Sequence, residues 1–445
     1  HTCRNRGCAG RLDTAKGCAV LIRFEVSNFR SIRDPVELSM VAVDRDRPEA
    51  RPIPNLGESL LPVAAIYGPN ASGKTNVIAA LTWLHTAVRE SLRFWDDEIP
   101  IKSFAFADGP SRPSEFTIES AISGVRFEYV VELDSRAVRY EGLFHYPEKK
   151  RRRIFEREGA EFTLQRGLGS LSGTRGLLTE RALGLSIARR FNEPIVSDFA
   201  HDLFAAQKLT PWSPNLRLGF THRTDRWFET PSDHDQSALT STRDSARSTQ
   251  ADRTRALALL RMADRGIDDV VFDEQEVIFG AGPDSTQTRM LRRTRLLHRT
   301  GDERAPLDFD AESEGTRTWY RLIDPVLGAL KAGSLLLFDG LDASLHPTLS
   351  AQLISLFHDP ATNPRGAQLI FTSHDTSLLN HLNRDEVWLT EKTADGATRL
   401  GALAEFAGER VRKSQNLEKA YLHGRFGALP DVDRTDLLRA LGLIG

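Results

Sequence analysis

A strand-like apolar run that leads directly into a glycine-rich loop constrains this chain more than any other feature. Residues 64–75 read AAIYGPNASGKT and end in the complete pattern G-x-x-x-x-G-K-[ST], which a helical pattern follows. This order of strand, loop and helix predicts a cradle in which backbone N–H groups and Lys74 bind phosphates and the Thr75 hydroxyl binds Mg²⁺. The predicted nucleotide-binding residues of this loop are Gly68, Pro69, Asn70, Ala71, Ser72, Gly73, Lys74, Thr75 and Asn76.

A second apolar strand that ends in an acid lies far along the chain, at residues 334–339 (SLLLFD). An aspartate at the tip of a buried parallel strand can hold Mg²⁺ beside the loop threonine, because Mg²⁺ takes carboxylate and phosphate oxygens in such sites. We therefore predict that Thr75 and Asp339 are metal ligands and that Lys74 and Asp339 are catalytic. Taken alone, Asp339 also fits an ordinary turn residue after a strand.

The segments around this acid resemble the ABC-type ATPases. Residues 339–347 read DGLDASLHP, and the next apolar strand, at 369–375, places His374 where that superfamily has its switch histidine. Residues 312–316 (ESEGT) open a predicted helix and resemble a degenerate ABC signature, with Ser313 and Gly315 at a helix start suited to a γ-phosphate. The resemblance implies ATP as the nucleotide, a catalytic role for His374, and a homodimer in which Ser313 and Gly315 complete the partner's site. A plain N-cap is the alternative for Ser313.

Three segments narrow the resemblance further. Residues 22–32, residues 341–347 and residues 416–430 together resemble the bacterial AAA/ABC-like ATPases of the RloA kind, which are related to RecF and SMC head domains. The resemblance implies an α/β P-loop fold of ABC-type head architecture, with a β-rich N-terminal lobe and a mainly helical insertion. It also implies an ATPase that gates an effector protein encoded nearby in phage defence or abortive infection. The alternatives are a RecF/SMC-like DNA-repair ATPase and a nucleotide-switched scaffold that does not hydrolyse ATP.

One position departs from the ABC-type pattern. Gly340 stands where the resemblance calls for a glutamate that orients the attacking water, a contribution of roughly 10²–10⁴ in rate. The sequence therefore predicts slow hydrolysis, with Asp342 and His374 as weak substitutes. An ordinary ATPase with an unusual residue at this position is the alternative. The glutamine expected to sense the γ-phosphate is absent before Gln165, so it is replaced or lies in the insertion.

Length and composition set the domain organisation. The chain has 445 residues, 40% of them hydrophobic and 27% charged, which suits one head with an insertion. We expect a disordered or non-native extension at residues 1–19, an N-terminal lobe at 20–146, a mainly helical insertion at 147–282 and a C-terminal lobe at 283–445. No apolar run reaches the roughly 18 residues that span a bilayer, which predicts a cytoplasmic protein without a membrane partner.

Nucleic acid is a weaker expectation. The net charge of −2 argues against a uniformly basic DNA-coating protein, but residues 149–153 and 289–304 are local basic clusters that could contact DNA or RNA. A solvated basic turn is the more common role for such a cluster. The polar residues 230–254 between predicted helices are expected to form an exposed loop.

Overall fold

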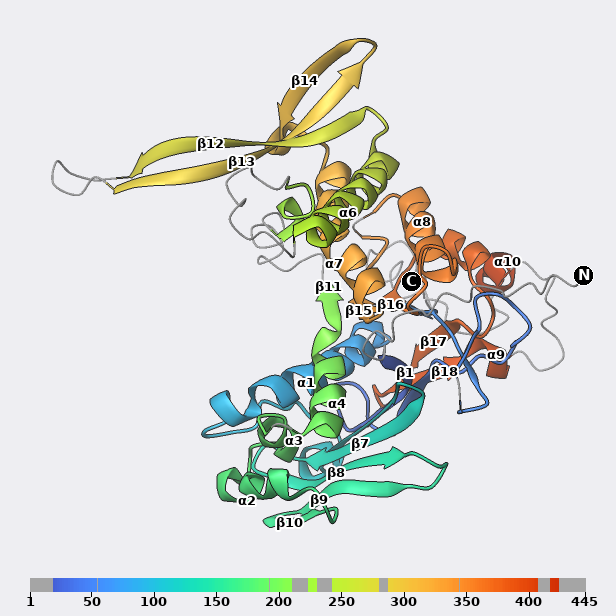
Figure 1. The fold of residues 1–445 in the computed structure, drawn as a ribbon. Helices are drawn as coiled ribbons and strands as arrows, with labels where there is room; N and C mark the ends of the chain where they lie inside the picture. The colour runs from blue at the N-terminus through green and yellow to red at the C-terminus, as the bar shows by residue number, and fades with distance from the viewer. Residues whose placement is uncertain are drawn as a thin grey trace, which may run out of the picture.

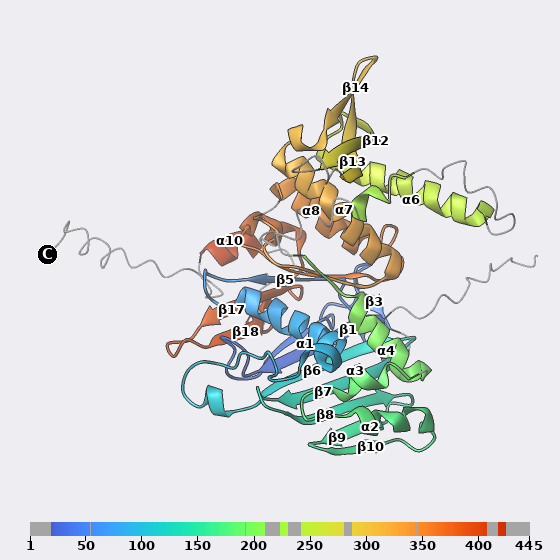
Figure 2. The same ribbon diagram turned by 90° about the vertical axis from the view of Figure 1, so that its left-hand side faces the viewer.

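The structure is a computed structural model that describes residues 19–53, 55–191, 193–209, 223–229, 242–279, 287–343, 345–406 and 417–423. The chain builds an antiparallel sheet and a mainly parallel sheet, with helix α1 between them and further helices on the far face of the parallel sheet (Figures 1 and 2). Expectations for residues 1–18, 230–241 and 424–430 lie outside the described residues.

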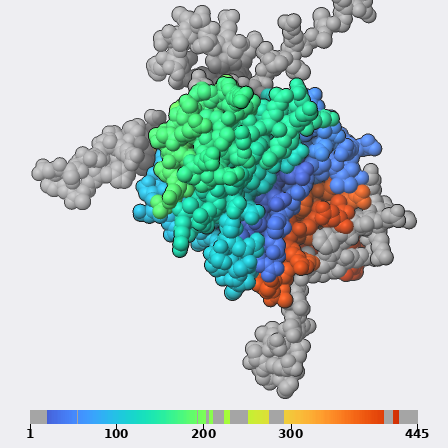
Figure 3. Space-filling view, turned by 90° about the horizontal axis from the view of Figure 1, so that it is seen from below, coloured from blue at the N-terminus to red at the C-terminus, as the bar shows by residue number. Residues whose placement is uncertain are grey.

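The antiparallel sheet has seven strands in the order β10-β9-β8-β7-β6-β1-β2. Buried and partly exposed residues alternate along β7, as expected for a sheet with one face against a core. Viewed from below, the N-terminal half of the chain covers most of this face of the molecule (Figure 3). The strands are β1 (Ala19–Ser27), β2 (Val36–Ser39), β6 (Ser114–Ile122), β7 (Val125–Leu133), β8 (Val138–Tyr146), β9 (Arg152–Glu158) and β10 (Glu161–Leu164).

The second sheet has six strands in the order β11-β15-β16-β5-β17-β18, all parallel except β18. Its central strands β5 and β16 are buried throughout, which explains their continuous apolar sequence. Because β16 lies between β5 and β15, the ends of all three strands meet at one edge. The strands are β5 (Val63–Tyr67), β11 (Gln207–Leu209), β15 (Leu335–Phe338), β16 (Gln368–Thr372), β17 (Val387–Lys392) and β18 (Thr398–Ala402).

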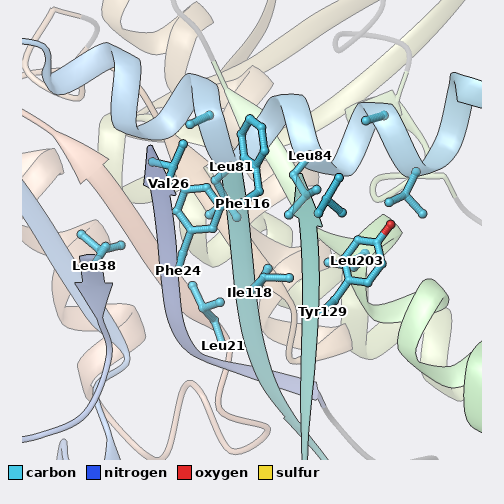
Figure 4. Close-up of a cluster of buried hydrophobic side chains, with 14 of the residues drawn as sticks. Leu21, Phe24, Val26, Leu38, Leu81, Leu84, Phe116, Ile118, Tyr129 and Leu203 are labelled. Carbon is cyan, nitrogen blue, oxygen red and sulfur yellow. The ribbon is translucent and has the colours of Figure 1, made fainter. Parts of the chain in front are cut away.

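Helix α1 (Lys74–Phe94) fills the space between the sheets. Its apolar face packs on side chains of β1, β6 and β7, including Phe24, Phe116 and Tyr129 (Figure 4). The same buried cluster includes Leu337 and Ile370 from the parallel sheet. The core thus joins both sheets through α1, which fixes the phosphate loop that precedes this helix.

Smaller helices follow the antiparallel sheet in the chain. Phe199 of α4 lies 5.7 Å from the ring of Phe127 in β7, so α4 packs on the sheet beside α1. These helices are α2 (Thr174–Leu177), α3 (Gly184–Ala188) and α4 (Pro194–Ala205). The predicted lobe boundary at residue 146 falls within the antiparallel sheet, which continues through β9 and β10 before these helices begin. The division into domains stays a prediction.

Helices α6 (Thr242–Ala263), α7 (Glu314–Ala332) and α8 (Pro347–His358) share a second buried cluster with the far face of the parallel sheet. Residues 242–254 belong to α6, so the expectation of an exposed loop was wrong there. The sequence signal failed because the first turns of α6 are polar and arginine-rich, and the first α6 residue described as buried and apolar is Ala256. The remaining short helices are α9 (Leu403–Phe406) and α10 (Leu417–Leu422).

A three-stranded sheet of β12 (Ile267–Phe279), β13 (Gln287–Thr300) and β14 (Glu303–Asp308) projects from the helices (Figure 1). The second predicted basic cluster, at residues 289–304, therefore lies on β13 and the start of β14, which leads into α7. Short strands β3 (Arg51–Pro52) and β4 (Ser59–Leu60) pair with each other, and Leu60 packs with Ile22 and Ala121 of the antiparallel sheet. Among the described residues, no helix combines the length and apolarity that crossing a bilayer requires.

Candidate nucleotide site

The phosphate loop begins where β5 ends and finishes at the first residue of α1. Two of its glycines leave no room for a side chain. A Cβ atom on Gly68 would lie 2.3 Å from Thr390 Oγ1, and one on Gly73 would lie 2.0 Å from Thr398 Oγ1. Both glycines also have positive φ angles, 151° and 106°, which L side chains rarely adopt. The pattern therefore requires glycine here for both the backbone path and the close approach of β17 and β18.

Side-chain hydroxyls hold the loop in place before any nucleotide binds. The Ser72 and Thr390 hydroxyls are 2.6 Å apart, and Thr390 also donates to the Tyr67 carbonyl at 3.1 Å. Thr398 donates to the Ser72 carbonyl at 2.9 Å. The loop is thus preorganised, so ATP binding loses little conformational entropy in ordering it.

Lys74 is buried and turned onto its own loop. Its ammonium group donates to the carbonyls of Gly68 at 2.8 Å and Pro69 at 2.9 Å. Burial lowers the pKa of Lys74 to about 8, while the carboxylates of Asp342 and Asp339 oppose that shift. A cation held at this point in a low-dielectric setting suits the phosphate contact predicted for it.

The predicted metal ligands lie together in the structure. Thr75 donates its hydroxyl to Asp339 Oδ1 at 3.0 Å, although the residues come from α1 and the end of β15. Thr372, at the end of β16, donates to the same oxygen at 2.8 Å and accepts from the Gly340 N–H at 2.7 Å. A hydroxyl and a carboxylate at this spacing suit Mg²⁺, which binds few protein oxygens and completes its shell with phosphate and water.

His374, the predicted switch histidine, and Asp342 also lie together. The backbone N–H of His374 donates to Asp342 Oδ1 at 3.1 Å. Desolvation and the positive charge of Lys74 lower the pKa of His374, and Asp342 opposes this shift, so the imidazole is neutral at neutral pH. Gly340 has φ 78°, a left-handed conformation that carries the chain from Asp339 toward Asp342. The backbone itself therefore favours glycine at the position of the expected glutamate.

The sequence did not identify two cationic residues near the site. Arg30 Nη1 donates to Asn76 Oδ1 at 3.4 Å, and Arg30 adopts a left-handed φ of 51°. Lys208 on β11 is paired with Leu337 in register, so it shares a sheet face with Asp339 by strand alternation. The pKa of Lys208 is lowered, mainly by desolvation. The charge of Asp339 opposes this shift, and the charge of Arg30 adds to it. Only the segment containing Arg30 carried a sequence signal.

Gln207 is a glutamine in the predicted insertion, which is one of the two places left open for the γ-phosphate-sensing glutamine. Strand β11 brings Gln207 into the parallel sheet. Its amide nitrogen, however, lies 3.2 Å from where a Cβ would stand on Gly328 of α7. Gln207 thus faces α7, and Lys208 rather than Gln207 lies on the Asp339 face of the sheet.

Ser313 and Gly315 stand at the start of α7. The Ser313 hydroxyl accepts from the Thr316 N–H at 3.1 Å and is the N-cap of the helix. A Cβ atom on Gly315 would lie 3.8 Å from the Ser313 hydroxyl, so a side chain would have space there. Within the described part of the chain, no hydrogen bond joins Ser313 or Gly315 to the phosphate loop, and their predicted role at a nucleotide stays a prediction.

Both predicted basic clusters are engaged in ion pairs. In the first, Arg151 meets Glu128 at 3.0 Å and Arg153 meets Glu156 at 2.8 Å. On the projecting sheet, Arg295 meets Asp273 at 2.9 Å and Arg304 meets Asp268 at 2.8 Å. The acids cancel much of the positive charge that a nucleic acid would need at these clusters.

Solved structures similar to this chain include SMC heads. One is an SMC head bound to the C-winged helix domain of ScpA, with 13% identity, a TM-score of 0.39, and coverage of 86% of this chain and 97% of that one. The SMC head domain from Thermotoga maritima has 13% identity, a TM-score of 0.37, and coverage of 86% and 98%. A third, derived from Pyrococcus furiosus and bound to the C-terminal domain of ScpA, has 11% identity, a TM-score of 0.39, and coverage of 87% and 97%.

No curated protein matches the chain. The fold assignment rests on the strand order and phosphate loop described above. Residues 63–380 match a protein family described as "AAA domain, putative AbiEii toxin, Type IV TA system". This match starts at β5, ends after His374 and includes the loop, Ser313 and Asp339. Because it spans well over half of the sequence, the chain belongs to this AbiEii-type family of AAA domains and is an AAA/ABC-like P-loop ATPase.

Proposed function

We propose that this protein binds ATP with Mg²⁺, hydrolyses it slowly, and uses the bound nucleotide to join two copies that gate an effector protein. The observation that carries the proposal is the Thr75, Asp339 and Thr372 network beside the buried Lys74. Phosphate oxygens and water would complete the shell of a metal ion held by Thr75 and Asp339. Bound Mg²⁺ would neutralise phosphate charge, with Thr75 and Asp339 as its protein ligands.

The hydrolysis step rests on Asp342 in this proposal. Gly340 has no side chain to orient water, whereas the Asp342 carboxylate is anchored by the His374 N–H and exerts the largest attraction on Lys74. Its influence on Lys74 supports a place for Asp342 near the γ-phosphate in this proposal. Asp342 would orient the attacking water from a less favourable distance than a glutamate, and neutral His374 would bind the γ-phosphate.

Steady-state ATP hydrolysis of the purified protein tests this assignment. Lys74→Ala should abolish ATP binding, and Asp342→Asn should reduce turnover by roughly 10²-fold while ATP still binds. Gly340→Glu should not increase turnover, because a glutamate there must adopt the left-handed backbone of Gly340. Faster turnover by Gly340→Glu, with Asp342→Asn silent, would show that the site lacks only its glutamate and that Asp342 has no role.

The start of α7 supports the dimer. Ser313 and Gly315 lie at the N-terminus of α7, where the Ser313 hydroxyl caps the Thr316 N–H, and a helix N-terminus attracts a phosphate. A second copy placed head to tail would supply this half to the nucleotide of the first. ATP would then bind between the two copies, and its hydrolysis would release them.

A pair of substitutions at Ser313 separates capping from nucleotide contact. Ser313→Asp keeps an N-cap as good as serine, so the free energy of unfolding should stay unchanged. Its negative charge would meet the partner's γ-phosphate, so ATP-dependent dimerisation should be lost in light scattering. Ser313→Ala should lose about 1 kcal/mol of stability from the cap and also dimerise poorly. If the Ser313→Asp variant dimerised with ATP as wild type does, Ser313 would act only as a helix cap.

The family description supports a place in bacterial defence, because it names an AbiEii toxin and a type IV toxin–antitoxin system. We propose that the ATP-joined state restrains or releases a neighbouring effector. Pull-down of the neighbouring gene product with and without ATP, using wild type and Ser313→Asp, tests this step. DNA-stimulated turnover without a protein partner would instead favour a DNA-repair ATPase, and binding without turnover would favour a nucleotide-switched scaffold.

A further inference from the structure

Helix α10 lies beside the end of β5, directly before the phosphate loop. The ring centroids of Tyr421 in α10 and Tyr67 in β5 are 6.2 Å apart, and the rings meet edge to face. Both side chains are buried in the cluster that the parallel sheet shares with its outer helices. The helix belongs to residues 416–430, one of the three segments that carry the family resemblance, yet no step of the proposed ATP reaction uses it. The contact with Tyr67 places α10 next to the candidate nucleotide site.

Tyr67 also binds the backbone next to the predicted switch histidine. Its phenol hydroxyl donates to the carbonyl of Asp375 at 3.1 Å, and Asp375 directly follows His374. On the other side of His374, the backbone N–H of Ser373 donates to the Ile66 carbonyl at 3.2 Å. Ile66 and Tyr67 are the last two residues of β5, so this strand holds the backbone on both sides of His374.

Glu418 of α10 binds the turn that follows the predicted switch histidine. Its carboxylate accepts from Asn380 Nδ2 at 2.8 Å and from the Thr376 hydroxyl at 3.4 Å. Both donors belong to the 3-10 helix η5 (Thr376–His381), which begins directly after Asp375. Two elements, β5 and α10, therefore hold the short segment that carries His374.

The protonation of Tyr67 suits this contact. Burial is the main cause that raises the pKa of its phenol well above the usual range, and the charge of Asp375 adds to the shift. The phenol therefore keeps its proton at neutral pH and can always donate to the Asp375 carbonyl. A hydrogen bond in such a buried setting is stronger than one in water, so its loss should loosen the backbone beside His374.

His374 needs an accurate position if it binds the γ-phosphate. A group that acts on a reacting phosphate must lie within about 0.5 Å of its productive geometry, and a displacement of about 1 Å can cost roughly 100-fold in rate. Desolvation and then the charge of Lys74 lower the pKa of His374, so its imidazole lies within electrostatic reach of that lysine. Small movements of the His374 backbone would therefore change its distance to a phosphate bound at Lys74.

We propose that Tyr67 and Glu418 are positioning residues that hold His374 for the γ-phosphate, so that α10 influences ATP hydrolysis without contacting the nucleotide. The inference rests on the proposed role of His374 in hydrolysis. Because Lys74 and the phosphate loop bind ATP, loss of either positioning residue should slow hydrolysis and leave ATP affinity unchanged. A residue that only stabilised the fold would not separate the two quantities in this way.

Single-turnover ATP hydrolysis, with the full-length protein in excess over ATP, tests the positioning role. Tyr67→Phe keeps the ring beside Tyr421 and removes only the hydroxyl, whereas Glu418→Ala removes the bonds to η5. Each variant should hydrolyse ATP about fivefold to tenfold more slowly and bind ATP as wild type does. Glu418→Gln can still accept a hydrogen bond and should recover part of the rate. The matched control is Leu422→Ala, on an exposed residue of the same helix, which should leave both rate and affinity unchanged.

A double-mutant cycle with His374 separates positioning from general destabilisation. In a His374→Ala background, Tyr67→Phe should cause no further loss of rate, because the group that it positions is already absent. Additive losses, or wild-type rates in both Tyr67→Phe and Glu418→Ala, would overturn the inference while the proposed role of His374 stands. A His374→Ala variant with the wild-type rate would refute that role itself, and the inference with it.

Hydrogen exchange of the protein without nucleotide gives a readout that does not depend on activity. Exchange at residues 373–381 should speed up in Tyr67→Phe and Glu418→Ala, while the loop at 68–75 stays as protected as in wild type. Unchanged exchange at 373–381 in both variants would show that neither residue holds this segment.

Discussion

Thr75 and Asp339 share a 3.0 Å hydrogen bond that joins the first turn of α1 to the end of β15. The residues are far apart in sequence, and the strand order β15-β16-β5 brings them to one sheet edge. Thr372 from the strand between them binds the same carboxylate oxygen. The two residues predicted to bind Mg²⁺ are therefore held together by the strand order of the sheet.

Asp339→Asn should separate charge from geometry at this point. The asparagine amide oxygen can still accept from Thr75 and Thr372, so the melting temperature should change by only a few degrees. Without the negative charge, Mg²⁺-dependent ATP hydrolysis should fall by at least about 100-fold. A magnesium titration of the hydrolysis rate checks this, and turnover equal to wild type would remove Asp339 from the site.

The lowered pKa of Lys74 couples ATP binding to protons. The free protein holds Lys74 with a pKa of about 8, and triphosphate oxygens should raise it again. ATP binding should therefore take up a proton above about pH 8, and affinity should fall toward tenfold per pH unit as pH rises further. Calorimetry in buffers of different ionisation enthalpy at about pH 7 and about pH 9 measures this uptake. A Lys74→Arg variant that still binds ATP should show no such uptake, because its guanidinium stays charged.

Gly340 should tolerate only residues that accept a left-handed backbone. Gly340→Ala should lower the free energy of unfolding by about 1–2 kcal/mol, whereas Gly340→Asn should cost less, because asparagine adopts this conformation more readily. Thermal or urea unfolding of both variants tests the difference. If alanine and asparagine were equally destabilising, the φ of Gly340 would not be the reason for glycine here.

Lys208 should influence metal binding through Asp339. Its positive charge competes with Mg²⁺ for the carboxylate, and it also adds to the attraction for phosphate. Lys208→Gln should therefore weaken ATP binding when metal is absent and lower the Mg²⁺ concentration that gives half-maximal hydrolysis. Lys150→Gln, on the turn between β8 and β9, removes the same charge far from Asp339 and serves as the control. Identical magnesium curves for both variants would exclude this role.

Local patterns predicted the parts of the site that depend on short segments. The loop at 68–75 was readable because its glycines, lysine and threonine form one short, contiguous pattern between a strand and a helix, although Thr390 and Thr398, which pack against the glycines, lie far along the chain. Asp339 and His374 were readable because each follows a continuous apolar strand, and the structure places them at one sheet edge. The family match supports the AAA/ABC-like ATPase assignment, while the narrower RloA-like relation stays a prediction.

Residues that reach the site only through pairing of distant strands could not be predicted from the sequence. Lys208 gains its position only because β11 pairs with β15, and that short strand has no distinctive pattern. Gly340 was interpreted as a lost side chain, since sequence carries no φ angle. The arginine clusters were visible in the sequence, but the ion pairs that Arg151, Arg295 and Arg304 make with acids of other strands were not.

The position of β5 also affects how the chain folds during synthesis. Its neighbours in the sheet are β16 and β17, which the ribosome makes long after residues 63–67. Until then, this wholly apolar strand has unpaired edges on both sides, a state prone to aggregation. The phosphate loop thus cannot reach its final form on a growing chain, and premature termination before β16 should yield insoluble fragments rather than a partial nucleotide-binding protein.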